Sequence, residues 1–221
     1  MFQSVRRAVV QGVEKTWHTL ASHTGEGKGE HLWDKESNLF KRDILMNGQL
    51  LGENIDVEVR IEAIRKIGIL AYTGGLDASK LAGMYLERMV AYFQDTEAPP
   101  PLRLQVIKSI AEMCRTHKDN VQTIIDLGVA EDIIAKLRSA GTDFSLVRWG
   151  CYTLVGLCAV SLVILKSVQS NYGDEELKKK LQVLSDLSWH AWPRNYALVL
   201  MDLIGFTNPN AEEETCDDSV W

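Results

Sequence analysis

The sequence predicts an all-α fold in which about four helical repeats stack on one another. Three observations predict it: an arginine-headed apolar segment recurs at nearly constant spacing, each copy has helical periodicity, and turn-forming residues separate the copies. The arginines are Arg60, Arg103, Arg148 and Arg194, at steps of 43, 45 and 46 residues. Helical repeats of about this length stack because a single repeat cannot bury its apolar face alone.

Each copy carries apolar or small residues at three positions that are four and then three residues apart. This i, i+4, i+7 pattern is typical of a helix that buries one face. The positions are Ala63, Ile67 and Leu70, then Val106, Ile110 and Met113, then Cys151, Val155 and Cys158, and finally Ala197, Met201 and Ile204. Further apolar stripes lie between the copies, so each repeat is expected to combine a long helix with one or more partner helices.

Glycine, proline and asparagine gather where the pattern requires a helix to stop. The breaks fall at residues 73–75, 99–101, 139–142 and 171–174. These residue types end helices because they favour turn conformations or lack a backbone donor. The repeat region is therefore expected to span residues 57–207.

One part of the chain resembles a known repeat family in detail. Residues 120–137 are similar to the armadillo signature Asn-x-x-x-Ile-x-x-x-Gly-x-Ile/Val-x-x-Leu-x-x-Leu, and residues 148–159 resemble the end of the third armadillo helix. The resemblance implies a short right-handed armadillo/HEAT-like solenoid of about four repeats. It also implies that Gly128 lies at the tight turn between the first two helices of its repeat, where a side chain would obstruct close approach.

The resemblance implies a binding surface on the long helices, because stacked repeats curve and present an extended concave face. Outward positions, judged by their spacing from the buried stripe, are Arg65, Ile69, Lys108, Glu112, Thr153, Leu157, Val199 and Leu203. Armadillo proteins that hold extended peptides, such as importin alpha and beta-catenin, often carry an Asn before the final Leu-Ala of this helix. Here the matching residues are Ile69, Glu112, Leu157 and Leu203, so recognition of nuclear localisation signals is not expected.

The two ends of the chain differ in composition from the repeats. Residues 1–22 have apolar residues at helical spacing opposite basic ones, which predicts an amphipathic helix that caps the first repeat or docks on a membrane surface or partner. Residues 23–56 are rich in glycine and are expected to form a linker with a short helix. Residues 208–221 are acidic and aperiodic, which predicts a disordered tail.

The charge distribution argues against nucleic-acid binding. The formal net charge is −6, but five of the negative charges lie in residues 211–221, which leaves −1 for the rest of the chain. A nearly neutral body lacks the basic face that releases phosphate counterions. The expected partner is therefore a protein.

The uncharged stretch from Trp149 to Leu165 is seventeen residues long, close to the length of a short membrane span. Spanning usually takes about 20 apolar residues, and this stretch contains Gly150, Gly156 and Ser161. A buried helix is the favoured interpretation, with membrane association through residues 149–165 or 1–22 as a remote alternative. The cysteine spacing matches no disulfide framework and the N-terminus resembles no secretory signal, so a cytoplasmic location is expected.

Catalytic and metal-binding patterns are weak. Cys114 and His117 have the spacing of two metal ligands, but the sequence has no second Cys/His pair that would complete a zinc site. The chain contains no Gly-x-Ser-x-Gly, His-Glu-x-x-His or dinucleotide-binding glycine motif. The sequence therefore predicts no enzymatic activity, no cofactor and no metal.

These observations favour a non-enzymatic adaptor or scaffold that binds a protein through the repeat surface. The alternative is a structural component of a cytoskeletal, ciliary or axonemal assembly. Leu157 and Leu203, if exposed, would form an apolar interface for a helix, because solvent-facing apolar residues often mark a covered surface. Neither the partner nor the oligomeric state follows from the sequence.

Overall fold

The computed structural model describes residues 33–206, except residues 116, 140 and 142. This part of the chain contains eleven α-helices and no strand, which confirms the predicted all-α class. The predicted amphipathic helix at 1–22 and the predicted acidic tail at 208–221 lie outside the described residues.

The helices are α2 (Trp33–Gln49), α3 (Val57–Thr73), α4 (Gly75–Gly83), α5 (Leu86–Gln94), α6 (Pro100–Met113), α7 (Lys118–Asp126), α8 (Val129–Arg138), α9 (Phe144–Val160), α10 (Leu162–Gln169), α11 (Glu175–Asp186) and α12 (Tyr196–Ile204). From α3 to α9, each long helix is followed by a pair of shorter helices before the next long one. The helix breaks coincide with the predicted turn residues at 73–75, 99–101, 139–142 and 171–174.

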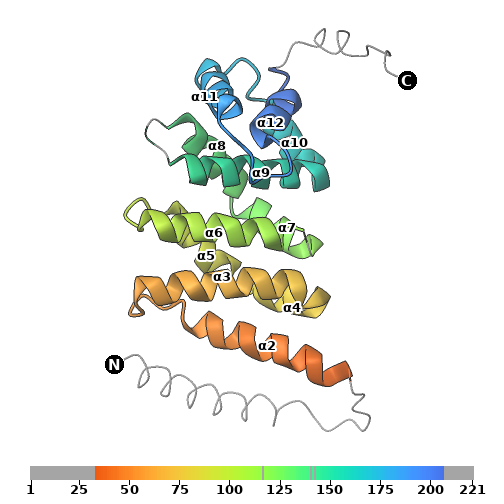
Figure 1. Cartoon of the computed structure of the whole chain (residues 1–221). Helices are drawn as coiled ribbons and strands as arrows, with labels where there is room; N and C mark the ends of the chain where they lie inside the picture. Colours follow the sequence, from red (N-terminus) through yellow and green to blue (C-terminus); the bar gives the residue numbers. More distant parts are fainter. Residues whose placement is uncertain (1–32, 116, 140, 142, 207–221) are drawn as a thin grey trace, which may run out of the picture.

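Four helices pack on one another in the order of the chain. Three of them contain a recurring arginine, and the fourth, α12, follows Arg194. α3 packs on α6, α6 on α9 and α9 on α12. Each also contacts the helix directly before it in the chain: α3 packs on α2, α6 on α5, α9 on α8 and α12 on α11. Figure 1 shows the resulting layers, with α2 at one end of the stack and α11 and α12 at the other.

The predicted apolar stripes form the core. Their members are buried or packed against a single hydrophobic cluster that runs through all of these layers. α2 belongs to the same core, because Ile44 at its centre and Leu51 just after it are completely buried. This corrects the expectation of a linker with a short helix up to residue 56: α2 has seventeen residues and packs on α3 and α4.

Two helix contacts depend on the absence of a side chain. A Cβ added to Gly68 of α3 would lie 2.7 Å from the Cβ of Ser109 and 2.9 Å from its Cα. The Ser109 hydroxyl, in α6, donates a hydrogen bond of 2.9 Å to the carbonyl oxygen of Ile64. A Cβ at Gly150 of α9 would lie 2.9 Å from Ile133 of α8. Long helices therefore approach their neighbours at distances that only glycine permits.

The residues that carry the armadillo resemblance have structural roles. Asn120 of α7 is buried, and its amide donates hydrogen bonds of 2.9 and 3.0 Å to the carbonyl and hydroxyl oxygens of Ser79 in α4. Gly128 separates α7 from α8 and has a φ of +72°, a left-handed conformation that favours glycine. The expected position of Gly128 at this tight turn is confirmed.

The spacing of the recurring arginines does not match the spacing of the helices in the third and fourth copies. The residues before α3, α6 and α9 are Asp56, Pro99 and Asp143, at steps of 43 and 44 residues. α12 begins only at Tyr196, because the Asn195 side chain accepts hydrogen bonds from the backbone N–H groups of residues 197 and 198. Arg194 therefore precedes its helix instead of lying within it.

The uncharged stretch of residues 149–165 is not one helix. α9 ends at Val160, and the Ser161 hydroxyl accepts a hydrogen bond from the N–H of Ile164 at the start of α10. Among the described residues, no helix combines the length and the apolar composition needed to cross a membrane.

Replacing Gly68 by alanine is expected to lower the free energy of unfolding by about 1–3 kcal/mol, because the added methyl group overpacks the contact with Ser109. Gly156 of α9 is the matched control, since a Cβ there meets no atom within 4 Å. Gly156→Ala is expected to leave stability unchanged or raise it by up to about 1 kcal/mol through helix propensity. Urea denaturation measures both, and equal midpoints for the two variants would contradict the packing account.

Candidate functional site

The outward positions predicted on α3, α6 and α12 reach the surface to different degrees. Arg65 and Ile69 of α3 are exposed, Ile69 by 43%. The remaining predicted residues on these helices, which are Lys108, Glu112, Val199 and Leu203, are partly exposed. These six residues therefore lie where a partner could contact them.

The two predicted positions on α9 are wrong. Thr153 is 1% exposed and its hydroxyl donates a hydrogen bond of 2.8 Å to the carbonyl oxygen of Trp149, while Leu157 is completely buried. The cause is the register: α9 is displaced by 44 residues from α6, whereas the arginines suggest 45. Tyr152 and Gly156 take the corresponding outward positions. An apolar interface formed by Leu157 is therefore excluded.

Five aromatic rings gather where α9 meets α12 and the segment before it. They are Trp149, Tyr152, Trp189, Trp192 and Tyr196, called here the aromatic cluster. Ring centroids lie 4.7 Å apart for Trp149 and Trp192 and 4.9 Å apart for Tyr152 and Tyr196, in edge-to-face arrangements. This is the geometry that the ring quadrupole favours. Four of the rings remain partly exposed, and only Trp189 is buried.

Basic side chains border the aromatic cluster. The Lys108 ammonium of α6 lies 5.7 Å from the centroid of Trp149, and the Arg148 guanidinium lies 5.6 Å from the centroid of Trp189. Arg148 also donates a hydrogen bond of 3.1 Å to the carbonyl oxygen of Ser188. The ring quadrupole attracts a cation that lies over the aromatic face, which helps to hold these two groups at the edge of the cluster.

Arg115 joins the cluster to α3. Its guanidinium lies 4.9 Å from the ring of Tyr72, donates to the Tyr72 hydroxyl at 3.5 Å, and lies 3.6 Å from the carboxylate of Glu112. It also hydrogen-bonds to the phenol of Tyr152, whose pKa burial raises and Arg115 partly lowers again. Since Tyr152 contacts Tyr196, a continuous row runs from α3 past α6 and α9 to α12.

We call the exposed part of this arrangement the aromatic strip. It consists of Tyr72, Lys108, Arg115, Trp149, Tyr152, Trp192 and Tyr196. Tyr72 is 46% exposed at one end, and the other four rings of the strip are partly exposed. The strip combines large ring surface with positive charge and crosses all four of the helices that pack in sequence.

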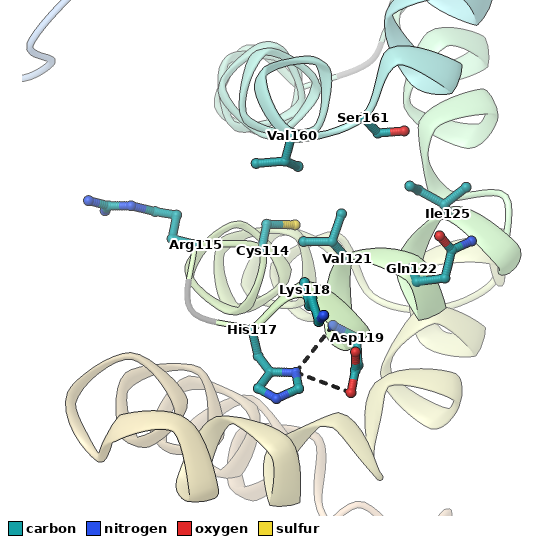
Figure 2. A pocket seen from close by; sticks show the side chains of 10 residues that line it. All are labelled: Cys114, Arg115, His117, Lys118, Asp119, Val121, Gln122, Ile125, Val160 and Ser161. Carbon is teal, nitrogen blue, oxygen red and sulfur yellow. Dashed lines mark hydrogen bonds and ion pairs between the residues drawn. The ribbon is translucent and has the colours of Figure 1, made fainter.

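A pocket of about 520 Å³ lies beside the strip, between the start of α7 and the junction of α9 and α10. Figure 2 shows Cys114, His117 and Asp119 on one side of it and Val160 and Ser161 on the other. His117 caps α7: its Nδ1 accepts a hydrogen bond of 3.2 Å from the backbone N–H of Asp119. The imidazole therefore stabilises the start of a helix.

The described cysteines are held as protonated thiols. Burial raises the pKa of Cys114 and Cys151 to about 12 and that of Cys158 to about 11. Because the thiolate is the nucleophile and the metal ligand, such thiols are inert at neutral pH. In the described part of the chain, no group of three or more His, Cys, Asp or Glu side chains is placed to hold a metal ion.

Comparison with known families identifies the type of domain. A family model described as armadillo-like helical domain-containing protein 2 matches residues 1–208. The chain belongs to this family. No curated protein and no solved structure matches it. The match spans every described helix of this armadillo-like helical protein, including α2, and also covers the preceding residues 1–32.

Several strip residues were not predicted as binding positions. Among the strip residues, only Lys108 is one of the outward positions that the sequence predicts. Trp149 and Tyr152 of α9 are three residues apart, a spacing that places two rings on one helical face, whereas Trp192 lies in the segment before α12. No comparable local signal exists for Tyr72 and Arg115, because they meet only across two packed helices.

The corrected register of α9 predicts different responses to truncation of two side chains. Leu157→Ala is expected to lower the free energy of unfolding by about 2–5 kcal/mol, because it leaves a cavity in the core. Ile69→Ala, at an exposed position of α3, is expected to change it by no more than about 0.5 kcal/mol. Denaturant titration followed by circular dichroism provides the measurement. A small change in the free energy of unfolding for Leu157→Ala would show that Leu157 is exposed and not buried.

The raised thiol pKa values predict resistance to alkylation. Iodoacetamide at pH 8 is expected to leave Cys114, Cys151 and Cys158 unmodified in the folded chain, since burial keeps each thiol protonated and inaccessible. In urea the same treatment should modify all three. Peptide mass spectrometry measures the modification site by site, and rapid labelling of any of them in the folded chain would show that its surroundings open.

Proposed function

We propose that this chain is a non-enzymatic protein-binding adaptor or scaffold of the cytoplasm. In this proposal its helical units form a short right-handed armadillo/HEAT-like solenoid of about four repeats, and the long helices bind the partner. The sequential packing of α3, α6, α9 and α12 supports the solenoid arrangement. Membership of the armadillo-like helical family supports protein binding as the general role.

The aromatic strip is the observation that carries the proposal. Partly exposed Trp, Tyr and Arg side chains supply most of the binding energy in protein interfaces, since they bury large area while retaining polar contacts. Here such side chains form a continuous row across several helices. A surface of this kind is suited to an extended segment that contacts each helix in turn.

The described polar groups favour a binding role over catalysis. The thiols of Cys114, Cys151 and Cys158 fill the core, and His117 caps α7. These potentially reactive side chains therefore stabilise the fold.

The mode of binding would differ from that of armadillo proteins with an asparagine ladder. The outward residues at the corresponding positions are Ile69 on α3, Glu112 on α6 and Gly156 on α9. None of these has a side-chain amide to clamp a peptide backbone. In our proposal the ligand is instead held by ring faces and by charge-assisted hydrogen bonds from Lys108 and Arg115.

Affinity capture from cell extract with the full chain tests this proposal. The double variant Ile69→Asp, Lys108→Glu is expected to recover the bound proteins about tenfold less well, because losing contacts worth about 1.4 kcal/mol has that effect. The matched control is Leu76→Asp, Lys80→Glu on α4, which changes one exposed apolar and one exposed basic residue away from the strip. The control should recover the same proteins as the native chain.

Thermal melting must show that both double variants stay folded. If the Ile69→Asp, Lys108→Glu variant recovers the same proteins as the native chain, the long-helix face is not the binding surface. If the captured proteins sediment with the insoluble cytoskeleton, the chain acts as a structural component of that assembly and not as a cytoplasmic adaptor.

A further inference from the structure

Two basic groups beside the aromatic cluster, those of Lys108 and Arg148, are not neutralised by described acidic neighbours, whereas Arg65 and Lys66 of α3 pair with Glu62. No described carboxylate lies within 4.0 Å of Lys108 or Arg148, and among the strip's cations only Arg115 pairs with a carboxylate, that of Glu112. Charges that are left unpaired on a partly covered surface attract a ligand of opposite sign. The face therefore favours an acidic ligand.

Three arginines with buried Nε atoms add positive charge to the long helices. The Nε atoms of Arg60, Arg103 and Arg148 are buried and have no hydrogen-bond partner among the described residues. Arg60 and Arg103 are the fourth residues of α3 and α6, and Arg148 is the fifth residue of α9, so positive charge recurs along the stack. Of the three, Arg148 borders the aromatic cluster, whereas Arg60 lies 5.3 Å from the ring of Tyr92 in α5.

The chain itself contains a segment of the matching chemistry. Residues 207–221 carry five carboxylates, at Glu212, Glu213, Glu214, Asp217 and Asp218, and no basic residue. They also include one large aromatic residue, Trp221. The segment follows directly on Phe206, which packs against the core beside the end of α12.

The length of this segment is sufficient to reach the strip. Fifteen extended residues span at most about 50 Å. Neighbouring packed helices have axes about 8–10 Å apart, so the path from α12 across α9 to α6 is only about 20 Å. Even after running back along α12, the acidic residues come within reach of Lys108 and Arg115.

We propose that the acidic segment 207–221 docks on the aromatic strip, with its carboxylates against Lys108 and Arg115. Attachment through α12 gives the segment an effective concentration in the millimolar range, so individually weak ion pairs are enough to hold it. An acidic partner segment must displace it. This competition rests on the proposed function of the strip, whereas the docking itself concerns only the isolated chain.

Cys216 offers a direct test of the docking. A nitroxide reagent is expected to react with Cys216 of the folded full chain, since the buried thiols of Cys114, Cys151 and Cys158 are unreactive. At low salt, the NMR signals of the indole N–H groups of Trp149 and Trp192 should be much weaker than in the same labelled protein after the nitroxide has been reduced. This loss of intensity should fade at high salt, because mobile ions screen exposed charges.

Charge substitutions in the segment and on the strip must abolish this effect separately. The first variant carries Glu212→Gln, Glu213→Gln, Glu214→Gln, Asp217→Asn and Asp218→Asn, which leaves the folded body untouched. The second carries Lys108→Glu and Arg115→Glu. Both should restore the indole intensities. The control Lys80→Glu, Arg88→Glu on α4 and α5 should retain the loss, since it reverses two exposed charges outside the strip.

Equal indole intensities in the native chain and in the chain with the neutralised segment would overturn the docking. Capture from extract distinguishes this failure from a failure of the proposed function. Suppose that the recovery of partners depends on Lys108 but not on the charge of residues 212–218. The long helices would then still be the binding surface, but the acidic segment would not compete for it. Recovery that increases when the segment is neutralised supports both.

Discussion

Where α3 meets α6, a single carbon added to Gly68 would lie 2.9 Å from the backbone of Ser109, so the two helices pack almost backbone to backbone. Each long helix packs on the next, and each buries one face in the continuous core. The opposite face is left outward on every layer. Because the layers follow one another closely, side chains on successive outward faces are near enough to touch, and this allows the aromatic strip to exist.

The end of the stack near α12 departs from the regular pattern, and the departure shapes the strip. α12 has only nine residues, and the segment before it brings Trp189 and Trp192 against α9. The indole N–H of Trp189 donates a hydrogen bond of 2.8 Å to the carbonyl oxygen of Leu184, which fixes the segment on α11. Rings therefore occupy space that a longer helix would fill, and part of their surface remains open to a ligand.

Unpaired positive charges and a group of negative charges lie in two different parts of the chain. Lys108 on the strip and Arg148 beside it have no neighbouring carboxylate among the described residues, while five carboxylates lie in residues 207–221. The net charge of −6 hides this separation, because the two contributions partly cancel. A protein surface with unpaired charge selects partners by complementarity and is sensitive to ionic strength. The same separation would let the chain regulate its own binding surface.

The sequence by itself determined the helical class, the buried stripes, the breaks between helices and the turn at Gly128, because these follow from periodicity and from local backbone preferences. It also placed Ile69 and Lys108 on an outward face. Only the tertiary structure decided that Leu157 is buried and that Tyr72 contacts Arg115. A displacement of one residue turns a helix by about 100°, and such a displacement is set by how α9 packs on its neighbours. Contacts between residues 43 apart likewise depend on the stacking of whole helices, which no local pattern specifies.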